Sequence, residues 1–163
     1  MVTSRGARIA LAVGRIFIGW TFLWPFLDKT FGLGFSTPAE RAWINGGSPA
    51  QGYLGGVEGP FAGFLQLFAN PFGDWLFMIG LFGIGIAMIT GAGVRLAAVT
   101  GTILMAMMYL AAIPMIAGGT NPIIDSHCLE AALLIIAAVT LSGDTWGVGR
   151  LWGRIIGRHT WLR

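Results

Sequence analysis

The sequence predicts an all-α membrane protein with four membrane-spanning helices, and three observations support this prediction. Hydrophobic residues make up 55% of the 163 residues, whereas charged residues make up only 10%, compared with roughly 25% in soluble domains. The mean hydropathy is +0.75. Four segments are long and apolar enough for membrane spans of about 20 residues. This composition excludes a soluble monomer, and it excludes a disordered chain, which needs low hydrophobicity and high charge.

We predict a single integral membrane domain, residues 1–163, with spans at residues 7–27, 75–92, 96–117 and 123–141. Arg15 lies inside the first span and no small-residue cleavage site follows it, which favours an uncleaved anchor over a signal peptide. Glycines inside the spans, among them Gly80, Gly83 and Gly85, are predicted to let the helices pack closely. Pro114 is predicted to kink the third span.

Basic residues are distributed unequally between the two sides of the predicted bundle. Four spans place both termini on one side together with seven arginines, whereas the other side has only Lys29 and Arg41. Because cytoplasmic segments carry the excess of Lys and Arg, we predict a multi-pass protein of the cell membrane with both termini in the cytoplasm. The seven arginines are Arg5, Arg8, Arg95, Arg150, Arg154, Arg158 and Arg163.

Residues 30–73, between the first two spans, are predicted to form a cap of short helices over the outer mouth of the bundle. Thr37-Pro38-Ala39-Glu40 is a capping box with proline at the first helical position. Whether the cap only seals the bundle or also shapes a ligand site stays open. Residues 142–163 predict a cytoplasmic amphipathic helix with a basic face, for which lipid headgroups are a better partner than nucleic acid.

Two ionisable residues lie deep in the predicted spans, where charge is costly and marks functional sites. Arg15 lies about 12 Å from the cytoplasmic side and Glu130 about 10 Å from the opposite side, at 1.5 Å per residue. The backbones of the two residues would lie at different depths in the membrane, and an arginine side chain is long enough to span most of this difference. We therefore expect an Arg15–Glu130 pair if the first and fourth helices are neighbours. The pair is either a structural ion pair or part of a polar site for a quinone headgroup or a proton path.

Asp125 and His127 lie at the start of the fourth span, and Asp28 and Lys29 lie at the end of the first span. Both pairs lie on the same side of the predicted bundle. Together with Arg41 these residues are predicted to form a polar cluster beneath the cap. Histidine in such a cluster can transfer a proton near neutral pH.

Motifs for bound metals and redox cofactors are absent from the sequence. His127 and Glu130 are three residues apart and share a helix face, but a metal site needs further ligands, and we predict none. Cys128 is the only cysteine, so the chain alone has no dithiol chemistry. There is no haem, flavin or iron–sulfur motif, and electron transfer would therefore be direct or would use a cofactor in a partner subunit.

Five short stretches, in their order and spacing, resemble the DoxX family of membrane proteins. They are residues 15–19 (RIFIG), 26–35 (FLDKTFGLGF), 42–49 (AWINGGSP), 121–127 (NPIIDSH) and 145–150 (TWGVGR). The resemblance implies a four-helix membrane bundle. The family includes DoxD-like proteins described as the large subunit of thiosulfate:quinone oxidoreductase, so it also implies a sulfur donor and quinone as acceptor. The matching polar positions are Arg15, Asp28, Lys29, Asp125 and His127.

Two functions stay open at this point. The first is a subunit of a membrane redox system that passes electrons from thiosulfate or a related donor to quinone. The alternative is a non-catalytic anchor, assembly factor or quinone- or lipid-binding protein for a redox partner, and self-association is also expected. For the first function, the candidate catalytic residues are His127, Asp125 and Arg15, and the candidate substrate- and quinone-binding residues are Asp28, Lys29, Arg41 and Glu130.

Overall fold

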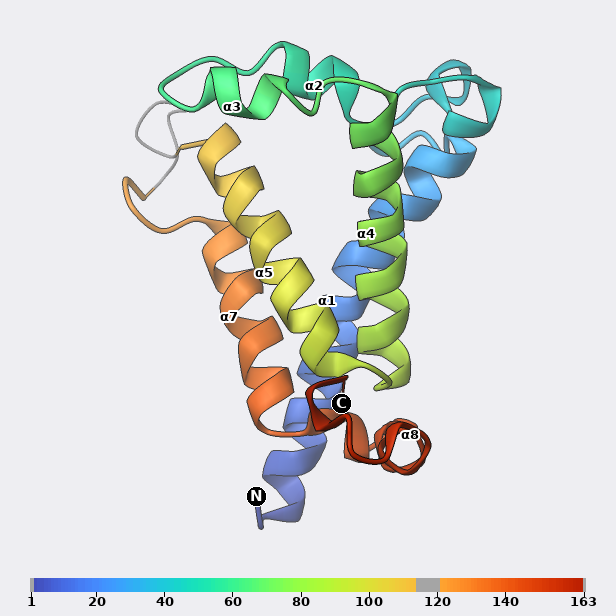
Figure 1. The fold of residues 1–163 in the computed structure, drawn as a ribbon, viewed down its shortest axis with the longest axis vertical. Helices are drawn as coiled ribbons and strands as arrows, with labels where there is room; N and C mark the ends of the chain where they lie inside the picture. The colour runs from blue at the N-terminus through green and yellow to red at the C-terminus, as the bar shows by residue number, and fades with distance from the viewer. Residues whose placement is uncertain (1, 114–120, 163) are drawn as a thin grey trace.

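The computed structural model describes residues 2–113 and 121–162, and helices are the only regular structure in these two segments. The body of the molecule consists of α1 (Arg5–Phe31), α4 (Pro71–Thr90), α5 (Val94–Ala111) and α7 (Ser126–Val139) (Figure 1). The first three are long and apolar enough to cross a membrane, whereas α7 is apolar but has only 14 residues. These helices indicate a membrane protein. Both chain ends lie toward one end of the bundle (Figure 1), which we call the terminal end, and the opposite end is the distal end.

Capping residues set the bounds of α1 and α4. The side chain of Asn70 accepts a hydrogen bond from the N–H of Gly73 (3.1 Å) at the start of α4, and Pro71 occupies the first turn, where its missing N–H costs nothing. Both helices end at glycines in the left-handed conformation, Gly32 (φ 65°) and Gly91 (φ 80°). At the start of α1, the side chain of Ser4 accepts a hydrogen bond from the N–H of Ala7 (3.5 Å). With Ser4 and Gly32 as its caps, α1 extends past both ends of the predicted span 7–27.

The helix α7 is shorter than the predicted span 123–141. The side chain of Asn121 accepts hydrogen bonds from the N–H groups of Ile123 and Ile124 (2.9 Å each), which folds this stretch into a turn. Asp125 then caps the helix, so α7 begins only at Ser126. In the predicted third span, α5 ends at Ala111, and the kink expected at Pro114 lies outside the described residues.

The segment between α1 and α4 forms short helices that lie across the distal end (Figure 1). The helix predicted from the capping box is instead two 3-10 turns, because Ala42 between them has extended backbone (φ −58°, ψ 142°). Asp74 of α4 is buried and accepts hydrogen bonds from the N–H groups of Ala50 (2.7 Å) and Gln51 (3.1 Å), which ties the start of α2 to α4. The elements are η1 (Ala39–Arg41), η2 (Trp43–Asn45), α2 (Gln51–Gly55) and α3 (Ala62–Gln66).

The C-terminal tail folds back against the terminal end as η3 (Ser142–Asp144), α8 (Gly149–Ile156) and η4 (Thr160–Leu162). Figure 1 shows α8 end-on beside upright bundle helices, so its axis runs across the bundle. The indole N–H of Trp152 donates to the carbonyl of Leu162 (2.8 Å), which holds the tail against α8.

Helix packing divides the bundle into two pairs. The most extensive contacts join α1 to α4 and α5 to α7, and those between α4 and α5 are fewer. Gly85 belongs to a close contact, since a Cβ atom added there would lie 2.8 Å from the Cβ of Leu23 on α1. A Cβ atom at Gly83 would have no such neighbour within 4 Å, and one at Gly80 would make only an ordinary contact with a Leu104 methyl at 3.9 Å, so neither glycine belongs to a close helix contact within the described residues. Both glycines face the space between α4 and α5.

Candidate functional site

An apolar groove of about 800 Å³ runs between α4 and α5, within the size range of small-molecule sites. Its walls come from the two helices, its distal end from α2 and α3, and its terminal end from the loop before α5 and from α8. Representative lining residues are Leu76, Gly80, Gly83 and Ala87 of α4, Leu96, Ile103 and Met107 of α5, Tyr53 and Leu54 of α2, and Trp152 of α8.

The groove extends along most of the bundle. On α4 its lining runs from Gly73 to Ala87, fourteen residues apart, which is about 21 Å at 1.5 Å per residue. Trp152 extends the lining beyond that, to the terminal end. Gly80 and Gly83 are both on the groove side of α4, and the absence of their side chains gives the groove its depth. A slender, mostly apolar molecule would fit this shape.

Two polar side chains at the distal end of the groove have no hydrogen-bond partner. Lys29, in the last turn of α1, and Tyr53 of α2 both line the groove, and neither has a hydrogen bond to a residue in segments 2–113 or 121–162. The hydroxyl of Thr100, also in the lining, donates to the carbonyl of Leu96 (3.0 Å) and is satisfied. Hydrogen-bond donors for a ligand are therefore concentrated at one end of an otherwise apolar groove.

Arg15 lies at the terminal end of the bundle, and its side chain is almost fully buried, at 1% exposure. Its guanidinium donates hydrogen bonds to the carbonyls of Met88 and Ile89 (2.9 Å) in the last turn of α4. It also donates to the carbonyls of Thr145 (3.4 Å) and Trp146 (3.0 Å), in the loop after η3. A cation suits the C-terminal end of a helix, where unpaired carbonyls concentrate negative charge. Arg15 thus clamps α1, α4 and the tail together.

The predicted Arg15–Glu130 pair does not form. Arg15 uses its terminal nitrogens on backbone carbonyls, and Glu130, half-buried on α7, makes no hydrogen bond or ion pair with a described residue. The depth estimate placed the two residues within reach, but backbone carbonyls near the guanidinium occupy its two terminal nitrogens, and its buried Nε–H has no hydrogen-bond partner among the described residues.

Asp28 and Arg41 lie apart from the groove lining. Asp28 is buried and accepts hydrogen bonds from the N–H groups of Phe35 (3.1 Å) and Ser36 (2.9 Å) and from the Ser36 hydroxyl (2.7 Å). Both carboxylate oxygens therefore organise the loop after α1. Arg41 is exposed on η1.

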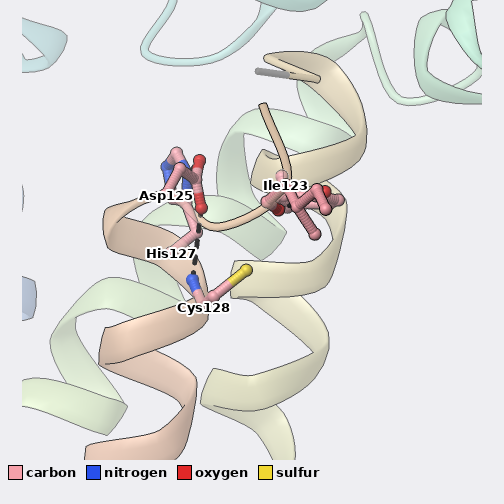
Figure 2. Close-up of polar contacts among 5 residues, drawn as sticks. Ile123, Asp125, His127 and Cys128 are labelled. Carbon is pink, nitrogen blue, oxygen red and sulfur yellow. Dashed lines mark hydrogen bonds and ion pairs between the residues drawn. The ribbon is translucent and has the colours of Figure 1, made fainter. Parts of the chain in front are cut away.

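Asp125 and His127 form a hydrogen-bonded pair at the start of α7 (Figure 2). One carboxylate oxygen lies 2.6 Å from the Nδ1 atom of His127, and the other accepts the N–H of Cys128 (3.2 Å). Burial acts to raise the pKa of Asp125, but the hydrogen bonds from His127 and Cys128 outweigh it and lower that pKa below its usual value. Both side chains of the pair are partly exposed, at 21% each.

The predicted polar cluster beneath the cap is not assembled. The C-terminal end of α1, which has Asp28 and Lys29, lies on the opposite side of the distal end from the start of α7 (Figure 1). Asp125 and His127 therefore form one site, and Lys29 belongs to the groove. Among the described residues, no three His, Cys, Asp or Glu side chains are grouped to hold a metal ion.

Sequence reasoning missed Tyr53 and assigned Gly80 and Gly83 to helix packing. The three-residue spacing of these glycines, with Gly85 on the opposite face of α4, was the available signal. Compared with known proteins, the chain matches no family model, no curated protein and no solved structure. Its membership of the DoxX family stays a prediction.

Proposed function

We propose that this protein binds a long-chain membrane quinone in the groove between α4 and α5. The observation that carries the proposal is an apolar groove with Lys29 and Tyr53 at one end, whose donors make no hydrogen bond to a described residue. A quinone has two carbonyl acceptors on a ring and a long apolar tail, so its headgroup fits the donors and its tail fits the groove. Pockets of this kind use a few polar groups to fix the orientation of a mostly apolar ligand.

The length of the groove favours a polyisoprenoid tail over a phospholipid. One leaflet is about 15 Å thick, half of a 30 Å hydrocarbon core, whereas the α4 wall alone is about 21 Å long. The acyl chains of a phospholipid in one leaflet would fill only part of this groove. A polyisoprenoid tail is long enough to occupy all of it.

We further propose a four-span topology with both termini in the cytoplasm, in which α7 makes a short fourth span with Asp125 at its outer boundary and the segment from 30 to 73 forms the outer cap. The common location of the two chain ends supports an even number of spans. The excess of arginine at the terminal end supports its cytoplasmic side.

A redox role is the second candidate, and the Asp125–His127 pair favours it. In this role the protein is a DoxX-like subunit that passes two electrons from thiosulfate or a related sulfur donor to the quinone. With thiosulfate, two ions give one electron each and join through a new sulfur–sulfur bond as tetrathionate, and the quinone takes up the two electrons and two protons to become quinol. A partner subunit would hold any additional cofactor. Histidine supported by a carboxylate is a suitable group for proton transfer.

Quinone binding is tested by measuring how much long-chain ubiquinone the purified protein retains in lipid nanodiscs. Gly83→Leu places a side chain in the groove and is expected to lower the retained quinone at least tenfold. Gly14→Leu is the matched control, because Gly14 also has no neighbour within 4 Å but lies on α1, outside the groove. Wild-type retention by Gly83→Leu would refute the proposed site.

The redox role is tested by thiosulfate-dependent quinone reduction in proteoliposomes, with and without co-purifying partners. We expect His127→Ala to abolish the reaction while leaving quinone retention unchanged. If the wild type reduces quinone no faster than empty liposomes do, the redox role is refuted, and the proposed quinone binding is unaffected.

A further inference from the structure

The helix α8 has an apolar face that the protein covers only in part. Trp152 and Ile156 are half-buried, and Trp152 lines the α4–α5 groove. Leu151 and Ile155 are 56% and 68% exposed, although their side chains are as apolar as those of the buried half. The contacts of Trp152 fix the rotation of the helix, so Leu151 and Ile155 face away from the bundle.

The opposite face of α8 is basic. Arg150 and Arg154 are four residues apart on one face, Arg158 follows shortly after the helix, and all three are exposed. Arg150 also lines a small cavity of about 40 Å³ with Arg8 and Asp144, which brings basic residues from both ends of the chain to one surface. Among the described residues, six arginines besides the buried Arg15 lie at the terminal end against one acid, Asp144.

The position of α8 matches that of a helix at a membrane surface. Its axis runs across the bundle (Figure 1), and the N–H of Val148, next to its first residue, donates to the carbonyl of Thr90 (2.8 Å) at the end of α4. Since α4 is long and apolar enough to cross a membrane, its end lies near the boundary between lipid and water. Two more large apolar side chains, Trp146 and Trp161, are exposed at this level.

We propose that α8 is a docking surface for anionic phospholipids at the terminal end of the bundle. Leu151 and Ile155 lie among the acyl chains, and Arg150, Arg154 and Arg158 bind the anionic headgroups. An amphipathic helix with arginines on its polar face binds such surfaces by burying apolar area and by electrostatic attraction. This docking does not depend on quinone binding in the groove.

The depth of α8 is tested by spin labelling in nanodiscs. A Cys128→Ser background removes the only native thiol, and Ile155→Cys and Arg154→Cys then receive a nitroxide. We expect the label at 155 to be relaxed mainly by oxygen, which enters the acyl chains, and the label at 154 mainly by a water-soluble nickel complex. Equal nickel access at both sites would place α8 in water and overturn the proposal. Shielding of the label at 155 from both reagents would show that protein covers this face, and would also overturn it.

The charge requirement is tested by native mass spectrometry of protein released from nanodiscs containing phosphatidylcholine and phosphatidylglycerol. Each arginine near an anionic surface contributes about fivefold to binding, so Arg150→Gln, Arg154→Gln and Arg158→Gln together should reduce bound phosphatidylglycerol on the order of a hundredfold. Arg41→Gln, at an exposed arginine of the distal end, is the control and should change nothing. Equal retention by the triple variant and the wild type would overturn the proposal.

Discussion

Arg15 and Lys29 are two cations of the same helix, and the structure treats them in opposite ways. Arg15, at the terminal end, is fully buried and donates to four backbone carbonyls from two other segments. Lys29, at the distal end, is half-buried and lines an apolar groove without a hydrogen bond to any residue in the described part of the chain. Arginine suits the site at the terminal end because its planar guanidinium can donate to several acceptors at once. The lysine ammonium, in contrast, is a compact charge on a flexible side chain.

The difference is that burial of a cation and availability of its donors for a ligand are separate properties in this protein. The more deeply buried cation has its terminal nitrogens occupied by backbone acceptors, and its remaining donor, Nε–H, is buried away from the groove. The less buried cation lines the groove and makes no hydrogen bond to a described residue. A residue with unoccupied donors in a groove is therefore a better candidate than one that is merely buried, and the two regions predict different results on mutation.

Arg15→Ala should cause a larger loss of stability than substitutions at Gly85, Lys29 or Asp125. A hydrogen bond to a charged group contributes about 1.5–3 kcal/mol, so the loss of several should lower the free energy of unfolding by at least about 3 kcal/mol. Unfolding in detergent, followed by tryptophan fluorescence, measures the change. Arg15→Lys should retain part of the stability, and Arg154→Gln, at an exposed arginine, should have almost no effect. If Arg15→Ala lowers the free energy of unfolding no more than Arg154→Gln does, the hydrogen bonds of Arg15 do not stabilise the fold.

Gly85→Ala and Gly83→Ala should separate the packed face of α4 from its groove face. A Cβ atom at Gly85 would lie 2.9 Å from the backbone nitrogen of Leu23, whereas one at Gly83 would meet nothing within 4 Å. Overpacking typically costs about 1–3 kcal/mol, so Gly85→Ala should destabilise the bundle by about this amount. Gly83→Ala should stabilise it by about 0.5–1 kcal/mol, since alanine is the better helix former. Equal effects in the same unfolding assay would contradict the packing described for α4.

Lys29→Gln should weaken quinone binding about tenfold with little change in stability. Removing a charged donor loses a hydrogen bond worth about 1.5–3 kcal/mol, and each 1.4 kcal/mol corresponds to a tenfold change in affinity. Titration of the nanodisc-embedded protein with long-chain ubiquinone measures the dissociation constant, with Arg41→Gln as a charge-matched control outside the groove. An unchanged dissociation constant would show that Lys29 does not bind the quinone headgroup, but it would not contradict quinone binding in the groove.

The helices of the body were the most predictable part of the structure from the sequence. Long apolar runs and local capping residues such as Asn70 and Gly91 act within a few residues, so a linear reading detects them. The start of α7 was missed because Asn121 and Asp125 bond to the backbone directly after them, and this outweighs the hydropathy of Ile123 and Ile124. Local polar bonds shortened an element that hydropathy alone would extend.

The candidate site was less predictable because its parts meet only in three dimensions. The acceptors of Arg15 are backbone carbonyls at residues 73 to 131 positions away, and a carbonyl has no residue identity that a sequence could reveal. Gly83 and Gly85 look equivalent in the chain, but the packing of α1 onto one face of α4 makes one a contact and the other a groove wall. Lys29 was found from its charge, whereas Tyr53 gave no signal before α2 was placed over the groove.

Asp125 should contribute much less to stability than Arg15, and the pH dependence of unfolding should reveal its contribution. Its carboxylate caps α7 and bonds to His127, and Asp125→Ala should cost about 1 kcal/mol at neutral pH, as the loss of a helix cap does. Because these hydrogen bonds lower the pKa of Asp125 in the folded protein, the stabilisation is fully present above the unfolded value of about 3.9 and is lost as pH falls through the folded value. Unfolding at a series of pH values should therefore show the wild type and Asp125→Ala converging below about pH 4. Asp125→Asn keeps a capping side chain without the charge and should fall between them at neutral pH. A constant gap between wild type and Asp125→Ala at every pH would mean that the ionised carboxylate does not stabilise the start of α7.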